Sequence, residues 1–417
     1  MSLRRAYLTA RGLMRARSVA AAAVASALLL TSGVVSAASL QGPISGWEQG
    51  TEPGTVSMYI YVPDALAPKP PILVTVHFCS GSAQGIFAQA KSGGMVAAAD
   101  QYGFIMLVPQ TTNNCWDVGT PPSLTHNGGG DTKAIVDQVN YTIGKYGANK
   151  DRVYVTGSSS GGMVTEAIVA VYPDVFKGGA EFAGVPAGCW AESDLDGQWS
   201  TPCAGGMITH TGQEWGDIAR AMYPGYTGFR PRLQLWHGSA DAIIQYTNHT
   251  EAIKQWINVM GLPDAKSATS TVSIGGHAYT HDEWKDSCSR TVLDVWSEEG
   301  GPHSTDANMN AQYTMPFFGL DMPGVDVDPQ VAPCTASGGG AGMPASGGAA
   351  GMLGGPAGTG GTLPANPDEN LPTVPATGCA CRVNNTSGST GALAIALAGL
   401  TVATFARRKS KRSARLR

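Results

Sequence analysis

Apolar runs typical of buried β-strands alternate with amphipathic stretches typical of helices between residues 39 and 322. The strand-like runs are "PILVTVHF" (71–78), "GFIMLVPQ" (103–110), "RVYVTG" (152–157), "RLQLWHG" (232–238) and "VLDVWSEEG" (292–300). The helix-like stretches are "DTKAIVDQVNYTIGKY" (131–146) and "GGMVTEAIVAVY" (161–172). Strands that alternate with helices in this way predict an α/β domain, in which helices cover both faces of a mostly parallel sheet.

The N-terminal segment has the order of an export signal. Five arginines, the last of them Arg17, precede the apolar run "SVAAAAVASALLL", and the small residues Ser36, Ala37 and Ala38 follow it. Signal peptidase cuts after small residues in this position, so we expect residues 1–37 to be a signal peptide that is removed near Ala37. The alternative, a first membrane anchor, fits less well because the apolar run is short.

The composition changes after Cys334. Residues 335–377 are rich in Gly, Pro and Ala and carry almost no large apolar side chains, which predicts a flexible linker because little surface can be buried. The globular domain is therefore expected to span residues 38–334. The remaining residues, 378–417, combine a cysteine pair, an apolar run at 391–406 and a basic end.

This last segment resembles the myxobacterial C-terminal sorting segment (MYXO-CTERM), in which a Gly-Cys motif precedes an apolar helix and an Arg-rich end. Gly378 and Cys379, with Cys381, supply that motif here. The resemblance implies processing at the cysteine and delivery to the cell surface or the medium. A permanent C-terminal anchor would use the same residues, since the apolar run is marginally long enough to span a bilayer and its basic flank follows the positive-inside rule. Membrane contact is expected only through this segment.

The charge of the chain limits the classes of partner. The 417 residues carry a formal net charge of -4, and 14% of them are charged. Without a basic excess, binding to nucleic acid or to an anionic membrane surface is not expected. A neutral, carbohydrate-like partner remains open.

The eight cysteines point to disulfides rather than to a metal site. Their number is even, and export places the chain in an oxidising compartment. Cys189 and Cys203 bracket one short loop and are the first pair that we expect, followed by Cys79 with Cys115. No two C-x-x-C motifs face each other, so no metal ion is expected.

The segment "VYVTGSSSGGMV" contains the pattern G-x-S-x-G. Gly157, Ser159 and Gly161 fill this pattern between a predicted strand and a predicted helix, which is the context of a nucleophile elbow. Of the three adjacent serines, only Ser159 has a glycine two residues away on each side. We therefore expect Ser159 to be the nucleophile, while the backbone N–H of Ser160 enters the oxyanion hole at the positive end of the helix.

A serine hydroxyl needs a base that a carboxylate orients, and in α/β-hydrolases the chain order is serine, acid, histidine. Asp241 follows the strand-like run 232–238 and is the predicted acid. His303 follows the next strand and a glycine-rich turn and is the predicted base. His277 and His281, in a polar stretch before that strand, remain alternatives for the base.

The loop after residues 71–78 supplies the other expected contacts. The N–H of Cys79 is a candidate for the second oxyanion donor because it follows a buried strand. Trp116, beside Cys115, is a candidate for stacking on a sugar or an aromatic acyl group, with a core position as the alternative. No organic cofactor is expected for this chemistry.

With these residues in place, the sequence resembles the secreted acetylxylan esterases of the polyhydroxybutyrate-depolymerase-like esterase group (carbohydrate esterase family 1). The similarity covers nearly all of residues 40–320 and is carried by "HFCSGSAQ", "NNCWDVGTPPSLTHNGGGD", "DRVYVTGSSSGGMV" and "RLQLWHGSAD". The resemblance implies an α/β-hydrolase fold without a large lid, a shallow groove for polysaccharide, and the same triad and oxyanion residues. Cys288 is unusual for this group, and we expect it to pair with Cys334 and so fasten the end of the domain.

The expected function is thus removal of acetyl groups from xylan by a secreted or surface-held monomer. Feruloyl esterase and polyhydroxybutyrate depolymerase activities are the rivals within the fold, since the triad does not select the acyl group. A surface-displayed binding module without catalysis is the rival from another class.

Overall fold

The computed structural model describes residues 38–47, 56–193, 199–303, 309–322, 324 and 328. Within these ranges, no helix is both long enough and apolar enough to cross a bilayer. The predicted signal peptide, the predicted linker and the apolar run at 391–406 lie outside the described residues.

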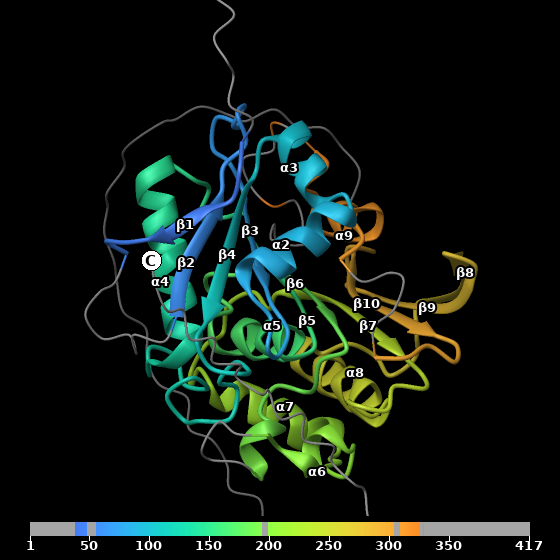
Figure 1. Cartoon of the computed structure of the whole chain (residues 1–417). Helices are drawn as coiled ribbons and strands as arrows, with labels where there is room; N and C mark the ends of the chain where they lie inside the picture. Colours follow the sequence, from blue (N-terminus) through green and yellow to red (C-terminus); the bar gives the residue numbers. More distant parts are fainter. Residues whose placement is uncertain are drawn as a thin grey trace, which may run out of the picture. The chain divides into compact units, whose positions relative to one another are not determined.

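The described strands form one ten-stranded sheet in the order β1-β2-β4-β3-β5-β6-β7-β10-β9-β8 (Figure 1). The strands are β1 (Gln41–Ile44), β2 (Val56–Tyr61), β3 (Ile72–Val76), β4 (Ile105–Thr111), β5 (Val153–Ser158), β6 (Gly178–Phe182), β7 (Arg232–Gly238), β8 (Ala268–Ile274), β9 (His277–Lys285) and β10 (Thr291–Glu298). The six central strands, which lie in the order β4-β3-β5-β6-β7-β10, are parallel to one another. At the edges of the sheet, β1 and β2 on one side and β9 and β8 on the other pair antiparallel with their neighbours. The predicted mostly parallel sheet is confirmed.

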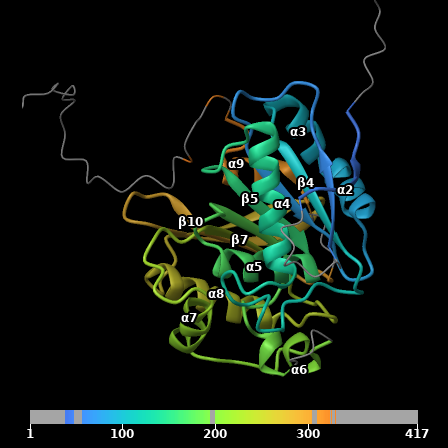
Figure 2. The same ribbon diagram turned by 90° about the vertical axis from the view of Figure 1, so that its left-hand side faces the viewer.

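Helices pack on both faces of this sheet, as predicted (Figures 1 and 2). On one face lie α4 (Gly130–Tyr146), α5 (Ser160–Val171), α7 (Gly212–Ala221) and α8 (Thr247–Met260). On the other face lie α2 (Ala83–Ser92), α3 (Met95–Tyr102) and α9 (Ala311–Phe318). The short α6 (Thr201–Ala204) and the 3-10 turn η1 (Trp190–Glu192) connect β6 to α7.

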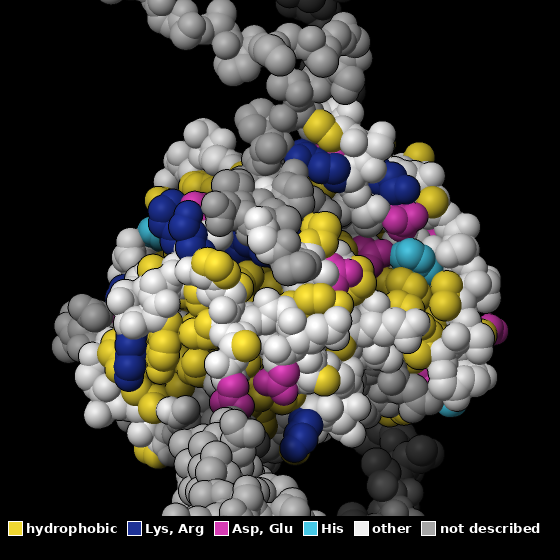
Figure 3. All heavy atoms as spheres, turned by 90° about the horizontal axis from the view of Figure 1, so that it is seen from above, with side chains coloured by type: hydrophobic (Ala, Val, Ile, Leu, Met, Phe, Trp, Pro, Cys, Tyr) yellow, Lys and Arg dark blue, Asp and Glu magenta, His cyan; other side chains and the backbone are white. Residues whose placement is uncertain are grey.

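The central strands are buried on both faces, which explains their continuous apolar sequence. Along β3, Val74 joins the core under α4 and α5, and its neighbour Leu73 joins the core under α2 and α3. Burial on both faces favours the β-branched runs by which these strands were predicted. On the face seen in Figure 3, side chains of both charge signs are scattered among apolar and uncharged ones.

The carboxyl ends of β3, β5, β7 and β10 meet at one edge of the sheet. Cys79, Ser159, Asp241 and His303 each follow one of these ends within five residues. Loops at this edge of a parallel sheet are where α/β proteins place their ligands. The topology therefore collects the predicted site residues at one edge.

Candidate active site

Ser159 occupies the turn between β5 and α5. Its backbone has φ 55° and ψ -120°, a conformation that costs a residue other than glycine about 1–3 kcal/mol. The N–H of Ser159 donates to the Phe182 carbonyl at 2.8 Å, which ties the turn to β6. Because α5 begins at Ser160, the serine side chain projects from the sheet edge at the positive end of a helix.

The two flanking glycines are required by close backbone contacts. A Cβ atom on Gly157 would lie 2.4 Å from the Gly161 carbonyl oxygen. A Cβ atom on Gly161 would lie 2.3 Å from the carbonyl oxygen of Val76, at the end of β3. Strand, turn and helix therefore approach one another more closely than any side chain at these two positions would permit.

Ser159, His303 and Asp241 form one hydrogen-bonded chain. The His303 Nε2 atom lies 2.9 Å from Ser159 Oγ, and His303 Nδ1 lies 2.7 Å from Asp241 Oδ2. A carboxylate accepts a hydrogen bond from Nδ1–H, which keeps the imidazole proton on Nδ1 and leaves Nε2 unprotonated and able to accept the serine proton. The arrangement can therefore raise the nucleophilicity of the hydroxyl.

The carboxylate of Asp241 is fully buried and accepts several hydrogen bonds. The amides of Ile243 and Ile244 donate to Oδ1 at 2.8 and 2.9 Å. Burial disfavours the charged form, but hydrogen bonds from His237, His303 and the Ile243 amide outweigh it and hold the pKa of Asp241 well below its usual range. Asp241 is thus a fixed negative charge beside His303 across the neutral range.

His237 is a second histidine on this carboxylate, and it is not among the residues that the sequence predicts for the site. It is the penultimate residue of β7, and its Nε2 atom lies 3.1 Å from Asp241 Oδ2 and 2.9 Å from the Ile244 carbonyl. Because a carbonyl oxygen only accepts hydrogen bonds, Nε2 of His237 carries the proton. This N–H donates to both the Ile244 carbonyl oxygen and Asp241 Oδ2. A signal was present in the sequence: a polar residue in a buried strand, four residues before the predicted acid.

Replacing His237 by Leu is expected to lower kcat about 10- to 100-fold with little change in KM, because a hydrogen bond to a buried charge is worth about 1.5–3 kcal/mol. His237→Gln should recover most of this loss, since its amide N–H can reach the place of Nε2. Steady-state kinetics on 4-nitrophenyl acetate measures both constants. His249→Leu, in the same buried region, is the control; equal losses in the Leu and Gln variants of His237 would contradict the role.

Two backbone amides beside Ser159 are available as oxyanion donors. Ser160 is the first residue of α5, so its N–H has no acceptor within the helix. Within the described residues, no hydrogen bond occupies the N–H of Cys79 either. The end of β3 lies against Gly161, which brings the Cys79 loop to the start of the same helix.

The structure corrects the expectation for Trp116. The side chain is 1% exposed, its Nε1–H donates to the His77 carbonyl at 2.8 Å, and its ring packs on the imidazole of His77. Neither face of the indole is open to a sugar. Trp116 instead supports the chain two residues before Cys79, because indole burial and its hydrogen bond fix the end of β3.

Two of the three disulfides expected from the sequence are confirmed. Cys79 bonds to Cys115, and Cys189 bonds to Cys203. The first bridge holds the loop of the candidate oxyanion donor to the loop after β4. Cys288 is also disulfide-bonded, but Cys334, its expected partner, lies outside the described residues.

The alternative histidines have other carboxylate partners. His277 Nδ1 lies 3.2 Å from a Glu298 oxygen, and His281 Nε2 lies 2.5 Å from Asp294 Oδ1. With Glu283, the latter two residues form a cluster that could in principle bind a cation. The Asp294 oxygens also accept hydrogen bonds from Gln234 and Trp296, so contacts within the sheet account for this cluster.

Glu181 in β6 supports the turn from behind. Its Oε2 atom accepts the Gly184 N–H at 2.6 Å, in the segment that follows the Phe182 carbonyl bonded to Ser159. Burial raises the pKa of Glu181, and the hydrogen bond from the Gly184 amide opposes this shift.

The chain resembles characterised ester hydrolases over most of its described length. A family model described as "Esterase PHB depolymerase" matches residues 56–275. A Feruloyl esterase B of Neurospora crassa is 43% identical over 297 residues, which cover 70% of this chain and 97% of that protein. Acetylxylan esterase A of Emericella nidulans is 46% identical over 216 residues, or 51% of this chain and 70% of that protein.

A solved structure agrees with these sequence similarities. The acetyl xylan esterase from Aspergillus awamori has 37% sequence identity and a TM-score of 0.61, over 68% of this chain and 99% of that one. The family model alone spans more than half of the chain. The protein therefore belongs to the esterase PHB depolymerase family.

Proposed function

We propose that the protein is a serine carboxylic-ester hydrolase that removes acetyl groups from xylan. The hydrogen-bonded chain from Ser159 through His303 to Asp241 carries this proposal, because it joins a nucleophile, a base and an orienting acid at one sheet edge. An intact chain of this kind also argues against a binding module without catalysis. No organic cofactor enters the proposed reaction.

The proposed reaction has two halves. His303 takes the proton of Ser159 as Oγ attacks the acetyl carbonyl carbon, and the amides of Cys79 and Ser160 bind the oxyanion. The protonated His303 gives its proton to the departing sugar oxygen, which leaves an acetyl-serine. A water molecule, deprotonated by His303, then attacks this ester and releases acetate, and the proton returns to Ser159.

The surface near the acid loop suits a polymer. Ile243 is 53% exposed although its amide binds the buried Asp241, so its side chain lies at the rim of the site. The Gln245 amide donates to the Ala204 carbonyl, which brings the segment with the exposed side chains of Trp199 and Met207 alongside this loop. We propose that Trp199, rather than the buried Trp116, offers an aromatic face to the substrate.

We further propose that the enzyme acts outside the cell as residues 38–334, after loss of the signal peptide. Residues 335–377 would then link this domain to a C-terminal segment, 378–417, that is either processed in sorting or kept as an anchor. An exported enzyme reaches an insoluble polymer directly, and the two described disulfides suit an oxidising compartment.

A substrate panel tests the proposal. The purified enzyme is expected to release acetate from acetylated xylan and from 4-nitrophenyl acetate, with both activities absent in Ser159→Ala. Methyl ferulate and polyhydroxybutyrate complete the panel, and acetate and ferulate are quantified by chromatography. Failure to release acetate from xylan, with turnover of another member of the panel, would contradict the acetyl assignment and leave the hydrolase assignment standing.

Feruloyl esterase activity is the second candidate, and one observation favours it. The Feruloyl esterase B of Neurospora crassa matches this chain over 97% of its own length. A ferulate ring would need an apolar surface beside the serine, which Ile243 and Trp199 could provide. A kcat/KM for methyl ferulate at least about tenfold above that for acetylated xylo-oligosaccharides would establish this candidate.

A further inference from the structure

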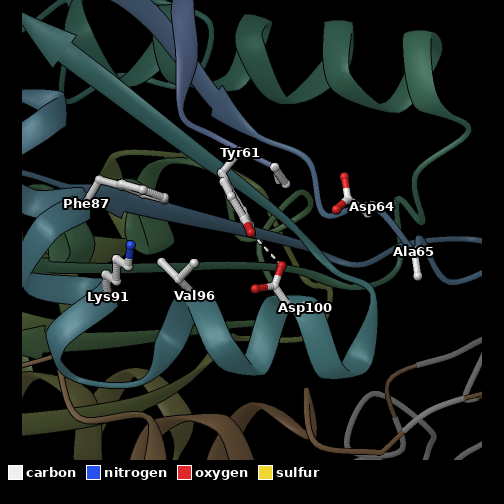
Figure 4. Close-up of a pocket in the computed structure, with 8 residues that line it drawn as sticks. Tyr61, Asp64, Ala65, Phe87, Lys91, Val96 and Asp100 are labelled. Atoms are coloured by element: carbon white, nitrogen blue, oxygen red, sulfur yellow. Dashed lines mark hydrogen bonds between the residues drawn. The ribbon is translucent and has the colours of Figure 1, made fainter. Parts of the chain in front are cut away.

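A separate pocket of about 330 Å³ lies at the opposite edge of the sheet (Figure 4). The end of β2 pairs with the start of β4, so Tyr61 marks the amino edge of the parallel strands, away from Ser159. Tyr61, Asp64, Phe87, Lys91 and Asp100 are among the lining residues, which come from β2, α2, α3 and the loop after β2. None of them takes part in the proposed reaction.

The pocket has an excess of negative charge. Asp64 and Asp100 supply two carboxylates and Lys91 one ammonium group, which leaves a net charge of -1 among the lining residues. The Tyr61 hydroxyl donates to Asp100 Oδ1 at 2.5 Å, and burial with this hydrogen bond raises the pKa of Tyr61. One further cation would neutralise the pocket.

Ala38 also lines this pocket, and two contacts hold it there. Ala38 and Leu40 both pack against the hydrophobic core under α2 and α3. Ala38 lies three residues before Gln41, the first residue of β1, and β1 pairs with β2, the strand that ends at Tyr61. Ala38 therefore lines the same pocket as Asp64 and Asp100.

We propose that this pocket binds the chain's own α-ammonium group, which is created when the signal peptide is cut between Ala37 and Ala38. The inference rests on the proposed export signal. Cleavage adds one water across this peptide bond and yields a carboxylate on Ala37 and an ammonium group on Ala38, with no net uptake of protons at neutral pH. The uncut chain has an uncharged amide there and cannot form the ion pair, so the pocket distinguishes the processed enzyme from its precursor.

The ion pair should stabilise the processed enzyme in a defined pH range. An α-amino group has an ordinary pKa of about 7.7–8.0, and Asp64 and Asp100 should raise it in the folded state, opposed only by Lys91 among the charged lining residues. A raised folded-state pKa gives stability that is complete below the ordinary value and is lost as the pH rises through the folded value.

The test uses the full chain exported with its own leader, after mass spectrometry has identified its first residue. NMR titration of the labelled Ala38 amine is expected to give a pKa at least about half a unit above the ordinary value. Asp64→Asn and Asp100→Asn should each lower it, whereas Asp151→Asn, an exposed acid paired with Lys150, should not.

Insertion of Gly-Ser between Ala37 and Ala38 moves the ammonium group out of the pocket. The melting temperature of this insertion variant at pH 7 should be about 1–3 °C lower than that of the parent enzyme. The difference should vanish near pH 10, where the ammonium group has lost its proton. The proposed role of the pocket would be overturned if the α-amino group of Ala38 had its ordinary pKa. It would also be overturned if neither Asp64→Asn nor Asp100→Asn changed that pKa. If the exported protein began at a residue other than Ala38, the assumed cleavage between Ala37 and Ala38 would be wrong and the inference would fail. Esterase assays on the same variants test the proposed function independently.

Discussion

Replacing Ser159 by Ala is expected to lower kcat/KM for 4-nitrophenyl acetate by at least about 10,000-fold, to the level set by binding and the oxyanion donors alone. Ser159 Oγ is the hydroxyl that lies 2.9 Å from His303 Nε2, so no neighbouring serine can replace it without moving the turn. The unfolding temperature should stay close to that of the parent, because the methyl group fits the same backbone. Initial rates and a thermal melt measure both quantities.

The matched control is Ser158→Ala, which removes the same atom one residue earlier, within β5. It should retain activity within about tenfold, because the elbow and its glycines are unchanged. A fluorophosphonate probe provides a second readout, since it should label the parent and Ser158→Ala but not Ser159→Ala. If Ser159→Ala kept its activity and its labelling by the probe, the assignment of Ser159 as the nucleophile would be wrong.

The central sheet was predictable because its strands are buried on both faces. β3 and β4 carry nearly continuous apolar runs, and in β5, β7 and β10 most of the interspersed polar residues are buried as well, as a two-sided core favours. The order of serine, acid and histidine along the chain then placed three polar residues at the same edge. The residues of each central strand were sufficient to predict it, because apolar residues in a short run indicate directly that the segment is buried.

The strand β6 was not predicted, and its glycines explain why. Its sequence, "GGAEF", has no apolar run. A Cβ atom on Gly179 would lie 2.8 Å from Leu233 Cδ2 in β7 and 3.0 Å from Thr165 Cγ2 in α5, so close packing of the neighbouring strand and helix selects glycine there. This requirement comes from elements outside the strand, and the strand's own residues do not record it.

The edge strands were missed for a different reason. In β8 most side chains are exposed, and in β9 exposed and buried positions mix, so the sequence resembles a polar connection. His277 and His281 appeared there as free candidates for the base, whereas strand pairing sets them beside Glu298 and Asp294. Cross-strand partners of this kind depend on register, which the single strand does not specify.

Side-chain direction accounts for the remaining differences at the site. The sequence places Trp116 and His237 within a few residues of the predicted donors and acid, but it does not say which way either ring points. In the structure Trp116 turns inward onto His77, and His237 turns toward the Asp241 carboxylate. The orientation of Trp116 follows from packing on a segment 39 residues earlier, whereas that of His237 follows from the turn after β7, which brings Asp241 and Ile244 back onto its ring.

Replacing His303 by Ala is expected to lower kcat/KM by about as much as the loss of Ser159, at least about 10,000-fold, because the two residues act as one unit. Without the imidazole, no described group within hydrogen-bond distance of Ser159 Oγ can take its proton. Asp241 cannot substitute, since its pKa is held well below the usual range and its oxygens are occupied by His237 and two amides.

The variant His277→Ala is the control that shows whether the loss of kcat/KM is specific to His303. His277 is half-exposed and pairs with Glu298, so its removal should change kcat/KM less than about threefold. Initial rates between pH 5 and 9 compare the two variants under conditions where Asp241 stays charged. If His303→Ala kept its activity while the alanine variant of His277 or His281 lost it, the base would be reassigned to β9, and Asp241 would no longer be the acid that orients it.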